Sequence, residues 1–164
     1  MKKLVVFFIL GILGLALAGD PAEGCWLSVD EKSGEVTAGW EIYQKDGILY
    51  GRILSAAGKP RDKLADKCRE SYAGFPVPGT VNAMTVVNTP WIYGLRQVKP
   101  GEWNGGNIID PSSGSMYSCK ITFHPVDGER YKTDTLEMRG EIGFGLGRSQ
   151  FWQKSTKVQA SGLK

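Results

Sequence analysis

His124 is the one histidine of the chain and therefore the first candidate for acid–base chemistry near neutral pH. It stands beside Pro125 at the end of an alternating segment, and no cysteine or serine stands out as its nucleophile. The carboxylates of Glu41, Glu137 and Glu141 would serve glycoside hydrolysis only if folding paired two of them, which nothing in the sequence indicates. We therefore interpret His124 as a structural histidine, identify no catalytic residue, and predict that the protein is not an enzyme.

A series of closely spaced glycines invites comparison with phosphate-binding loops. A dinucleotide fingerprint would need a third glycine where Arg148 stands, and no Lys-Ser or Lys-Thr pair follows. Turning of the backbone in a bent barrel strand explains these glycines better. The four residues are Gly140, Gly143, Gly145 and Gly147.

The segment from Asp110 to Gly114 shares one carboxylate with a calcium loop. A calcium ion takes several hard oxygen ligands, so this segment is a poor calcium site. It is typical of a turn instead, because Asp110 begins it, Pro111 fixes φ and Gly114 supplies a positive φ near its exit.

Three cysteines, Cys25, Cys68 and Cys119, lie far apart in the sequence. There is no close cysteine pair, and with one histidine the set does not form a zinc site. We expect no metal and no cofactor. An oxidising compartment would favour one disulfide, with all three pairings open and one thiol left over.

Aromatic residues are the group with the most bearing on binding. They would either fill a core or line a pocket in which Arg52 or Arg139 offers a polar anchor. An eight-stranded barrel is at the size where side chains fill the interior or leave room for one small ligand, so both alternatives stay open. The candidate ligand-binding residues are Trp40, Tyr50, Arg52, Trp103, Tyr117, Arg139 and Trp152.

These side chains must be positioned by strands, since apolar and polar residues alternate over several segments. Met116–His124 and Leu136–Ile142 show this period of two. Asp46-Gly47, between Trp40–Lys45 and Ile48–Leu54, is the strongest short-range signal of a hairpin. Several short strands separated by turn signals predict an all-β fold, an antiparallel barrel of about eight strands.

The ends of the predicted barrel carry a signal of closure. Gly24-Cys25-Trp26 opens the first strand and Arg148 opens the last, and these strands are neighbours in a closed barrel. We expect Trp26 to plug one end. The Arg148 guanidinium would lie across its face in a cation–π contact worth about 0.5–2 kcal/mol.

One internal segment departs from the alternating pattern. Leu64 and Cys68 are four residues apart with charges between them, which predicts a short surface helix at 60–71. A loop is expected at 72–79 and a strand at 81–87.

Residues 1–18 have the order of a cleavable secretory signal, with two lysines, an apolar run at 4–17 and small residues ending at Ala18. The run is shorter than the about 20 residues that cross a bilayer. We expect cleavage after Ala18, no membrane span thereafter, and a protein that is periplasmic or secreted. The mature chain would be a single domain at 19–154 with a frayed polar tail at 155–164.

The charge balance argues against a nucleic-acid partner. Without Lys2 and Lys3 of the expected signal, the chain carries 18 basic and 17 acidic side chains. The basic residues between 59 and 69 are interleaved with acidic ones, which is typical of a solvated face and not of a phosphate-binding patch.

Longer motifs carry a resemblance to a known family. Trp103–Pro111, followed by Gly114 and Tyr117, is similar to a Trp-x-Gly-Gly-x-Ile-Tyr-Asp-Pro motif with a later Gly and Tyr. Ile109 stands where that motif more often has Tyr. The family is catalogued as domain of unknown function 2147 and consists of exported bacterial proteins.

Two further regions extend the resemblance to about residues 24–154. Leu136–Gly143 and Gly147–Trp152 are similar to the C-terminal signature of the family, and Gly24–Trp26 and Ile42–Ile53 to its opening hairpin. The segment at 55–93 departs from the family pattern. The resemblance implies a lipocalin-like fold and no established biochemical activity.

Two functions follow as hypotheses. The first is the binding of a small, partly apolar ligand, such as a lipid or an envelope metabolite, in a lipocalin-like barrel. The alternative is a structural or protein-interaction module of the cell envelope, with a filled barrel and the atypical segment 55–93 as its contact surface.

Overall fold

A computed structural model describes residues 19–164 of the chain. The expected signal sequence at 1–18 lies outside the described residues.

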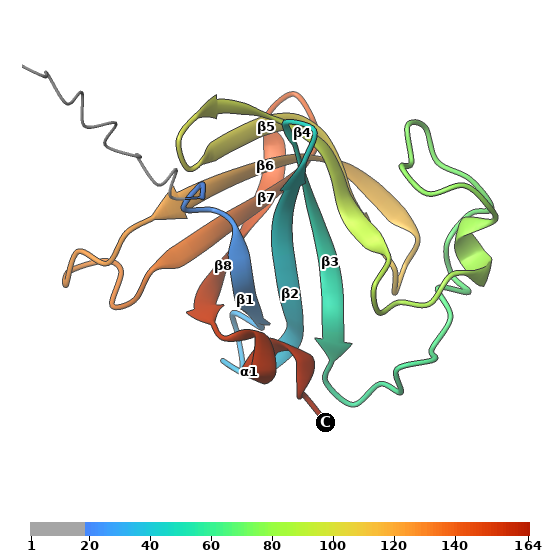
Figure 1. Cartoon of the computed structure of the whole chain (residues 1–164), viewed down its shortest axis with the longest axis horizontal. Coiled ribbons are helices and arrows are strands. Elements are labelled where there is room, and N and C mark those ends of the chain that lie inside the picture. Colours follow the sequence, from blue (N-terminus) through green and yellow to red (C-terminus); the bar gives the residue numbers. More distant parts are fainter. Residues whose placement is uncertain (1–18) are drawn as a thin grey trace, which may run out of the picture.

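Eight antiparallel strands close into one barrel, in which each strand pairs with the next and β8 returns to β1 (Figure 1). This confirms the predicted all-β fold and its strand number. The strands are β1 (Gly24–Val29), β2 (Val36–Lys45), β3 (Ile48–Ala56), β4 (Pro90–Lys99), β5 (Glu102–Asp110), β6 (Ser115–His124), β7 (Thr135–Gly143) and β8 (Leu146–Ser155).

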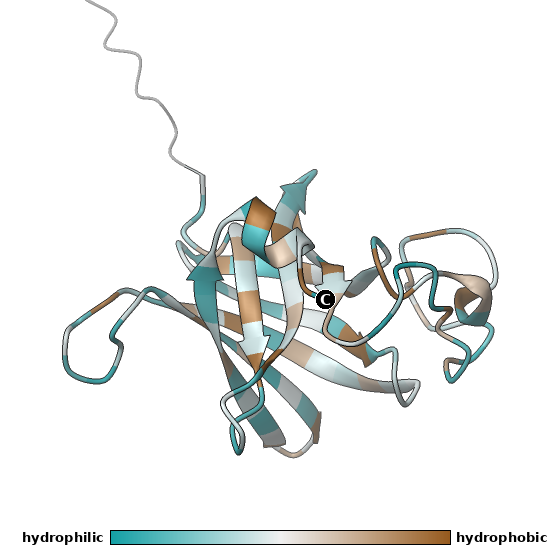
Figure 2. Ribbon diagram, turned by 90° about the horizontal axis from the view of Figure 1, so that it is seen from below, coloured by the Kyte–Doolittle hydropathy of each residue, from teal (hydrophilic) through white to brown (hydrophobic). Residues whose placement is uncertain are grey.

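Alternation along each strand directs apolar side chains inward, and Figure 2 shows the resulting bands of hydrophobic and hydrophilic residues. On β6, Cys119 and Ile121 are buried in the core, while Lys120 between them is not. The β2–β3 hairpin turns at Asp46 and Gly47, both with positive φ, as a tight two-residue hairpin loop requires.

The ladder that closes the barrel is short. Strands β1 and β8 pair over three positions, in which Trp26 lies opposite Lys154. The ammonium of Lys154 lies 4.2 Å from the centroid of the Trp26 ring and donates to the carbonyl oxygen of Glu23 at 2.9 Å. A Cβ at Gly24, which has φ 120°, would collide with this ammonium.

The predicted cation over Trp26 was therefore wrong, although the closure itself is confirmed. Arg148 lies near the start of β8, at the end of the strand away from Lys154, where it pairs with Gly140 of β7. Six positions separate Arg148 from Lys154 along the ten-residue strand, which is about 20 Å of extended chain. The sequence identified the two strands that meet but not their register.

Residues 20–22 form a floor under the barrel. The Asp20 carboxylate accepts hydrogen bonds from the backbone N–H of Gly101 at 2.9 Å, from Trp103 Nε1 at 3.0 Å and from Gln97 Nε2 at 2.7 Å. The indole N–H of Trp26 donates to the carbonyl oxygen of Ala22 at 3.0 Å. These bonds tie three parts of the chain together beneath one end of the barrel.

The interior nearest this floor is filled. The side chains in it are less than 2% exposed. They include Trp26, Ile42, Leu49, Ile92, Leu95, Trp103, Ile121 and Leu136.

The segment at 57–89 lies against the outside of the barrel beside β3 and β4 (Figure 1). It contains turns and bends at 60–71, so the predicted helix there was wrong, and the predicted strand at 81–87 begins as a short 3-10 helix, Val81–Ala83. Phe75 packs on Trp91 and Tyr93 of β4, with ring centroids 6.1 and 5.4 Å apart. The segment is a packed cover over outward-facing aromatic rings, and tertiary contacts override its local helical pattern.

The C-terminal tail is ordered, which corrects the expectation of fraying. It forms α1 (Lys157–Ser161), and Thr156 caps the helix by a reciprocal pair of bonds with Gln159. Ala160 is buried against Gly39 of β2, and its carbonyl oxygen accepts from the Ser55 hydroxyl at 2.6 Å. The helix thus covers the outer face of β1, β2 and β3.

The three cysteines are buried and unpaired within residues 19–164. Cys119 lies in the barrel core, Cys25 lies outside the barrel beneath α1, and Cys68 lies in the segment 57–89. Burial raises the pKa of the Cys119 thiol far above its ordinary value. The expected disulfide is absent from the described residues, in which Cys25 belongs to one buried cluster and Cys68 and Cys119 belong to the other.

Candidate functional site

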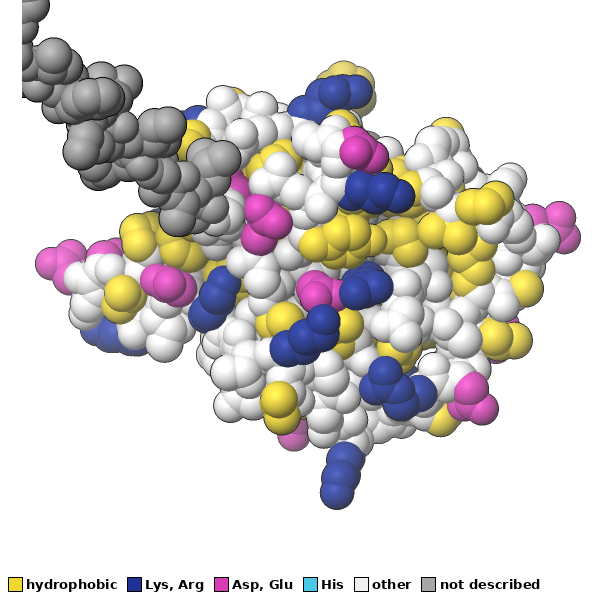
Figure 3. Space-filling view, in the orientation of Figure 1, with side chains coloured by type: hydrophobic (Ala, Val, Ile, Leu, Met, Phe, Trp, Pro, Cys, Tyr) yellow, Lys and Arg dark blue, Asp and Glu magenta, His cyan; other side chains and the backbone are white. Residues whose placement is uncertain are grey.

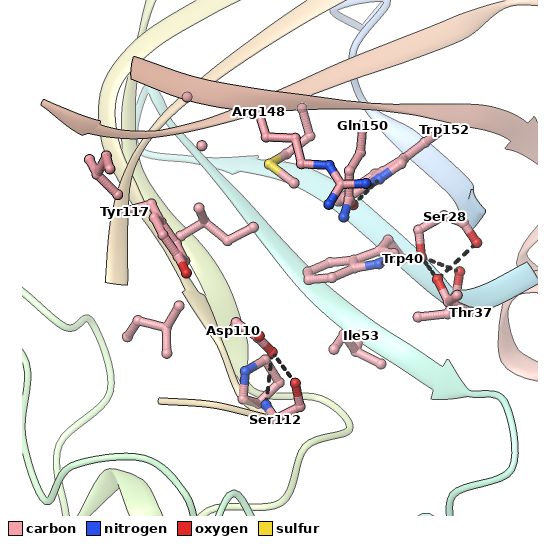
Figure 4. Close-up of a pocket in the computed structure, with 18 of the residues that line it drawn as sticks. Ser28, Thr37, Trp40, Ile53, Asp110, Ser112, Tyr117, Arg148, Gln150 and Trp152 are labelled. Atoms are coloured by element: carbon pink, nitrogen blue, oxygen red, sulfur yellow. Dashed lines mark hydrogen bonds between the residues drawn. The ribbon is translucent and has the colours of Figure 1, made fainter. Parts of the chain in front are cut away.

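The half of the barrel away from the floor holds an open cavity of about 820 Å³ (Figure 4). The barrel interior is therefore packed with side chains at the floor end and hollow at the other end. The sequence left open whether the interior is filled or has room for a ligand, and the structure combines the two. The cavity is lined by Ser28, Thr37, Ala38, Trp40, Ile53, Ile108, Ile109, Asp110, Pro111, Ser112, Tyr117, Met138, Gly140, Ile142, Leu146, Gly147, Arg148, Gln150 and Trp152.

Two stacked indoles form the inner wall of the cavity. Trp40 of β2 and Trp152 of β8 lie with ring centroids 4.7 Å apart and an interplanar angle of 22°. Trp40 Nε1 donates to the Ser28 hydroxyl at 3.3 Å, and Trp152 Nε1 donates to Gln150 Oε1 at 3.1 Å. With the polar edges satisfied, the two indoles form a rigid apolar wall, of which Trp40 is 6% exposed and Trp152 is fully buried.

Small polar groups surround this apolar wall. The Ser28 and Thr37 hydroxyls lie 2.8 Å apart, so one donates to the other, and each also lies 3.2 Å from a backbone carbonyl oxygen of the β1–β2 pair. Because these two hydroxyls are hydrogen-bonded within the protein, they form part of the cavity wall and need no hydrogen bond from a ligand. Gln150 and Tyr117 add an amide and a phenol to the lining (Figure 4).

Arg148 is the cationic side chain of the lining, and its guanidinium extends over the cavity beside Gln150 (Figure 4). Its Nη2 lies 3.2 Å from Glu31 Oε2, in the turn between β1 and β2. Both side chains are largely exposed, at 67% and 42%, so this pair adds little to stability and is free to exchange. Arg148 therefore supplies a positive charge at the mouth.

The turn between β5 and β6 forms part of the cavity rim. As predicted, Asp110 begins it, with its carboxylate accepting from the Ser112 backbone and hydroxyl and from the Ser113 hydroxyl. Gly114 has φ 73° and lies so close to the Lys67 backbone that a Cβ would overlap it. The segment 57–89 therefore supports the rim from outside.

The structure places three of the seven candidate ligand-binding residues in the cavity: Trp40, Tyr117 and Trp152. Trp103 points inward but belongs to the filled end, where it is bound to Asp20. The sequence indicates that Trp103 points inward but not at which height along the barrel axis its side chain lies.

The remaining three candidates lie outside the cavity lining. Arg52 lies 2.6 Å from Glu41, and Tyr50 stacks on Tyr43 with centroids 5.7 Å apart. Arg139 pairs with Glu141 at 2.6 Å. Arg148, and not Arg52 or Arg139, is the arginine that lines the cavity.

Sequence reasoning missed most of the lining, including Ser28, Ile53 and Gln150. Gln150 could have been predicted as a lining residue, because it shares a strand face with Arg148 and Trp152 at a period of two. Ser28 carried no such signal, since serine is common on either face.

His124 lies in a cluster of polar and aromatic side chains on the outside of the barrel. Its Nε2 lies 2.8 Å from Glu137 Oε2, and its ring stacks on Tyr131 with centroids 4.5 Å apart. Partial burial works against ionisation of Glu137, but hydrogen bonds from Ser149 and His124 outweigh it and lower the pKa of this carboxyl. The cluster fastens the loop between β6 and β7 to the outside of the barrel.

Within residues 19–164, no group of three or more histidine, cysteine or acidic side chains is placed to hold a metal ion. In the same part of the chain no helix is both long and apolar enough to traverse a bilayer. Figure 3 shows basic and acidic side chains interspersed over one face of the molecule.

Comparisons with known proteins agree with this fold. A family described as an uncharacterized protein conserved in bacteria (DUF2147) matches residues 24–154. A search among curated proteins returned no match. A solved structure, described as protein HP1028 from the human pathogen Helicobacter pylori and as belonging to the lipocalin family, aligns with a TM-score of 0.63 at 17% identity.

The alignment covers 87% of this chain and 90% of the Helicobacter protein. At this identity the likeness concerns the fold. The family match runs from the start of β1 to the last residue but one of β8, as the sequence motifs implied. The chain therefore belongs to the DUF2147 family of bacterial proteins, and its fold is lipocalin-like.

Proposed function

We propose that the protein binds one small, partly apolar molecule in the open half of its barrel. The observation that carries this proposal is the cavity of about 820 Å³ beside the stacked rings of Trp40 and Trp152. Ligand sites of small molecules typically enclose about 300–1,000 Å³ and combine an apolar wall with few polar groups. The cavity meets both conditions.

The charge at the mouth orients the ligand. An apolar body would lie against Trp40, Ile53 and Met138, and an anionic or strongly polar end would face Arg148. Because the Glu31 partner of Arg148 is exposed, a ligand anion can replace it at small cost. The preferred ligand is therefore an amphiphile with one acidic end.

The alternative function, an interaction module that uses segment 55–93, has less support. The apolar side chains of that segment pack against the barrel, where Phe75 covers Trp91 and Tyr93. Leu64 and Val77 are its large apolar residues left exposed. The apolar side chains of this segment are therefore already in contact with the barrel, and few of them are left for a partner protein.

We also propose that the protein acts after export, in the periplasm or outside the cell. The support is the order of residues 1–18 and the fact that the folded barrel begins directly after them, with Asp20 in its floor. Apolar envelope metabolites would be available to it there.

Titration of residues 19–164 with a fluorescent fatty acid tests the proposed function. We expect saturable binding of one probe per chain, and native mass spectrometry of protein purified from its own envelope should show a bound molecule. Arg148→Gln should weaken binding of the acidic probe, whereas Arg139→Gln, which removes an arginine outside the cavity, should not. Absence of both probe binding and a co-purified molecule would refute the proposal.

A further inference from the structure

Three large apolar side chains are exposed at the hairpin tip between β7 and β8. Phe144 is fully exposed, and Ile142 and Leu146 are 74% and 64% exposed. We call these three residues the apolar tip. Large apolar side chains gathered at one exposed place mark a contact surface more often than a scatter of single residues does.

The backbone holds this tip away from the rest of the protein. Phe144 has φ 50°, a conformation that is rare for a bulky side chain, and it stands between Gly143 and Gly145, which also have positive φ. A Cβ added at either glycine would meet no atom within 4 Å. The turn is thus shaped to present a phenyl ring to the surroundings.

Two arginines stand behind the tip on the same hairpin. Arg148 pairs with Gly140, and Arg139 pairs with Ser149, one position further back. At about 3.3 Å per residue, the backbone of Arg148 lies about 13 Å and that of Arg139 about 16 Å behind Phe144. Each has a carboxylate partner, but a guanidinium carries five N–H donors and can bind a phosphate as well.

The tip is continuous with the cavity. Ile142 and Leu146 both line the cavity mouth, and Phe144 lies between them at the outermost point of the hairpin. An apolar molecule that passes along these side chains reaches the cavity without leaving an apolar surface.

We propose that the apolar tip enters the interfacial region of a phospholipid bilayer, with Arg148 and Arg139 at the depth of the lipid phosphates. Apolar side chains of peripheral proteins reach about 5–10 Å into the boundary between headgroups and acyl chains. The backbones of the two arginines lie further back than this, and the Arg139 side chain reaches forward along the hairpin, where its Nη2 donates to the Gly145 carbonyl oxygen at 2.9 Å. The cavity mouth then faces the lipid. The role of the tip in ligand exchange rests on the proposed function, whereas bilayer contact does not.

A second copy of the chain fits the tip less well than a bilayer does. Stable protein interfaces bury about 800 Å² on each partner, which three side chains on one narrow turn do not provide. Insertion into lipid needs no matching surface, and the arginines complement anionic headgroups.

Vesicle flotation tests the proposal. The barrel, its floor and α1 are built from residues 19–164, so this segment is used, which also excludes the apolar run at 4–17. The vesicles contain phosphatidylcholine with one third phosphatidylglycerol. We expect the protein to float with them and Phe144→Asn to partition about tenfold less, since asparagine keeps the turn conformation. Val98 of β4 is 65% exposed and lies outside the apolar tip, so Val98→Asn is the matched control and should float like the unmodified protein.

A second variant reports the depth of insertion. The five native tryptophans are buried, so Phe144→Trp adds one exposed indole at the tip. Its fluorescence should be quenched by vesicles with brominated acyl chains and not by unbrominated ones. Equal flotation of Phe144→Asn and the unmodified protein, or no quenching of the added indole, would overturn the proposal.

Two further measurements separate the alternatives. If gel filtration shows a dimer that Phe144→Asn converts into a monomer, the tip is a contact between copies and the bilayer proposal is wrong. Binding of the fluorescent fatty acid without vesicles should be unchanged in Phe144→Asn, since Phe144 does not line the cavity. Probe binding without flotation removes the tip proposal alone, and flotation without probe binding removes the ligand function alone.

Discussion

Arg148 on β8 and Glu31 in the β1–β2 turn form an ion pair of 3.2 Å beyond the end of the three-residue ladder that joins β1 to β8. The pair bridges the seam with the fewest paired positions among the described strands and places its cation at the cavity mouth. The proposed selection of a ligand and the closure of the barrel therefore involve the same two side chains.

Loss of the Glu31 carboxylate should free Arg148 for an acidic ligand. We expect Glu31→Gln to bind a fluorescent fatty acid about two- to fivefold more tightly, the range that an exposed ion pair allows, with little change in stability. Glu141→Gln is the matched control, because it frees Arg139 outside the cavity. Equal effects of the two variants in a probe titration would contradict the assignment of Arg148 as the anchor.

The rim of the cavity depends on a close approach at Gly114. A Cβ there would meet the Lys67 backbone and would also strain a positive φ, so Gly114→Ala should lower the free energy of unfolding by about 1–3 kcal/mol in urea denaturation. Gly34→Ala shares nearly the same φ, 72° against 73°, with no atom within 4 Å of the added Cβ. It should cost clearly less; an equal cost would show that segment 57–89 does not support the rim.

The floor of the barrel should make stability depend on pH through Asp20. Burial works against ionisation of Asp20, but the N–H donors of Gly101, Trp103 and others outweigh it and lower the pKa of its carboxyl. Because the folded-state pKa lies below the unfolded value of about 3.9, the stabilisation is present above about pH 4 and is lost as pH falls through the folded pKa.

Asp20→Ala should therefore destabilise the protein by about 1–3 kcal/mol at pH 7, since the buried Trp103 N–H loses its acceptor, and by much less near pH 2. Urea unfolding at both pH values measures this. Asp30→Ala, which breaks hydrogen bonds within one exposed turn, should show a smaller effect at pH 7. A loss for Asp20→Ala that is the same at both pH values would exclude the ionised carboxylate as its cause.

Helix α1 should protect Cys25 from thiol reagents. A Cβ at Gly39 would overlap the Ala160 backbone, so we expect Gly39→Ala to displace the helix and to expose Cys25 to maleimide. Cys119, in the barrel core, should stay unreactive until the protein unfolds. Peptide mapping of the labelled sites distinguishes the two thiols. Val158→Ala, on the exposed side of α1, should leave both protected; labelling of Cys119 before Cys25 would contradict the packing described.

Local signals predicted the strands and hairpins well. Asp46-Gly47 needs positive φ at adjacent positions, and few dipeptides other than this type supply it. The capping box of Thr156 and Gln159 was an equally local signal that went unread in the polar tail.

Relationships between distant segments were less predictable. Arg148 and Lys154 lie on the same face of β8, so alternation alone cannot choose which of them meets Trp26; the register of closure decides. Trp103 and Trp40 likewise both point inward, but one fills the floor end and the other lines the cavity. Position along the barrel depends on all eight registers together.

The indole N–H signals of the five tryptophans in a ¹H–¹⁵N spectrum test the ligand cavity most directly. On titration with a fatty acid, we expect the Trp40 and Trp152 signals to shift at one ligand per chain. The signals of Trp26 and Trp103 in the filled end, and of Trp91 under the outer cover, should stay in place. Shifts confined to Trp91, or no shift at saturating ligand, would contradict a binding site inside the barrel.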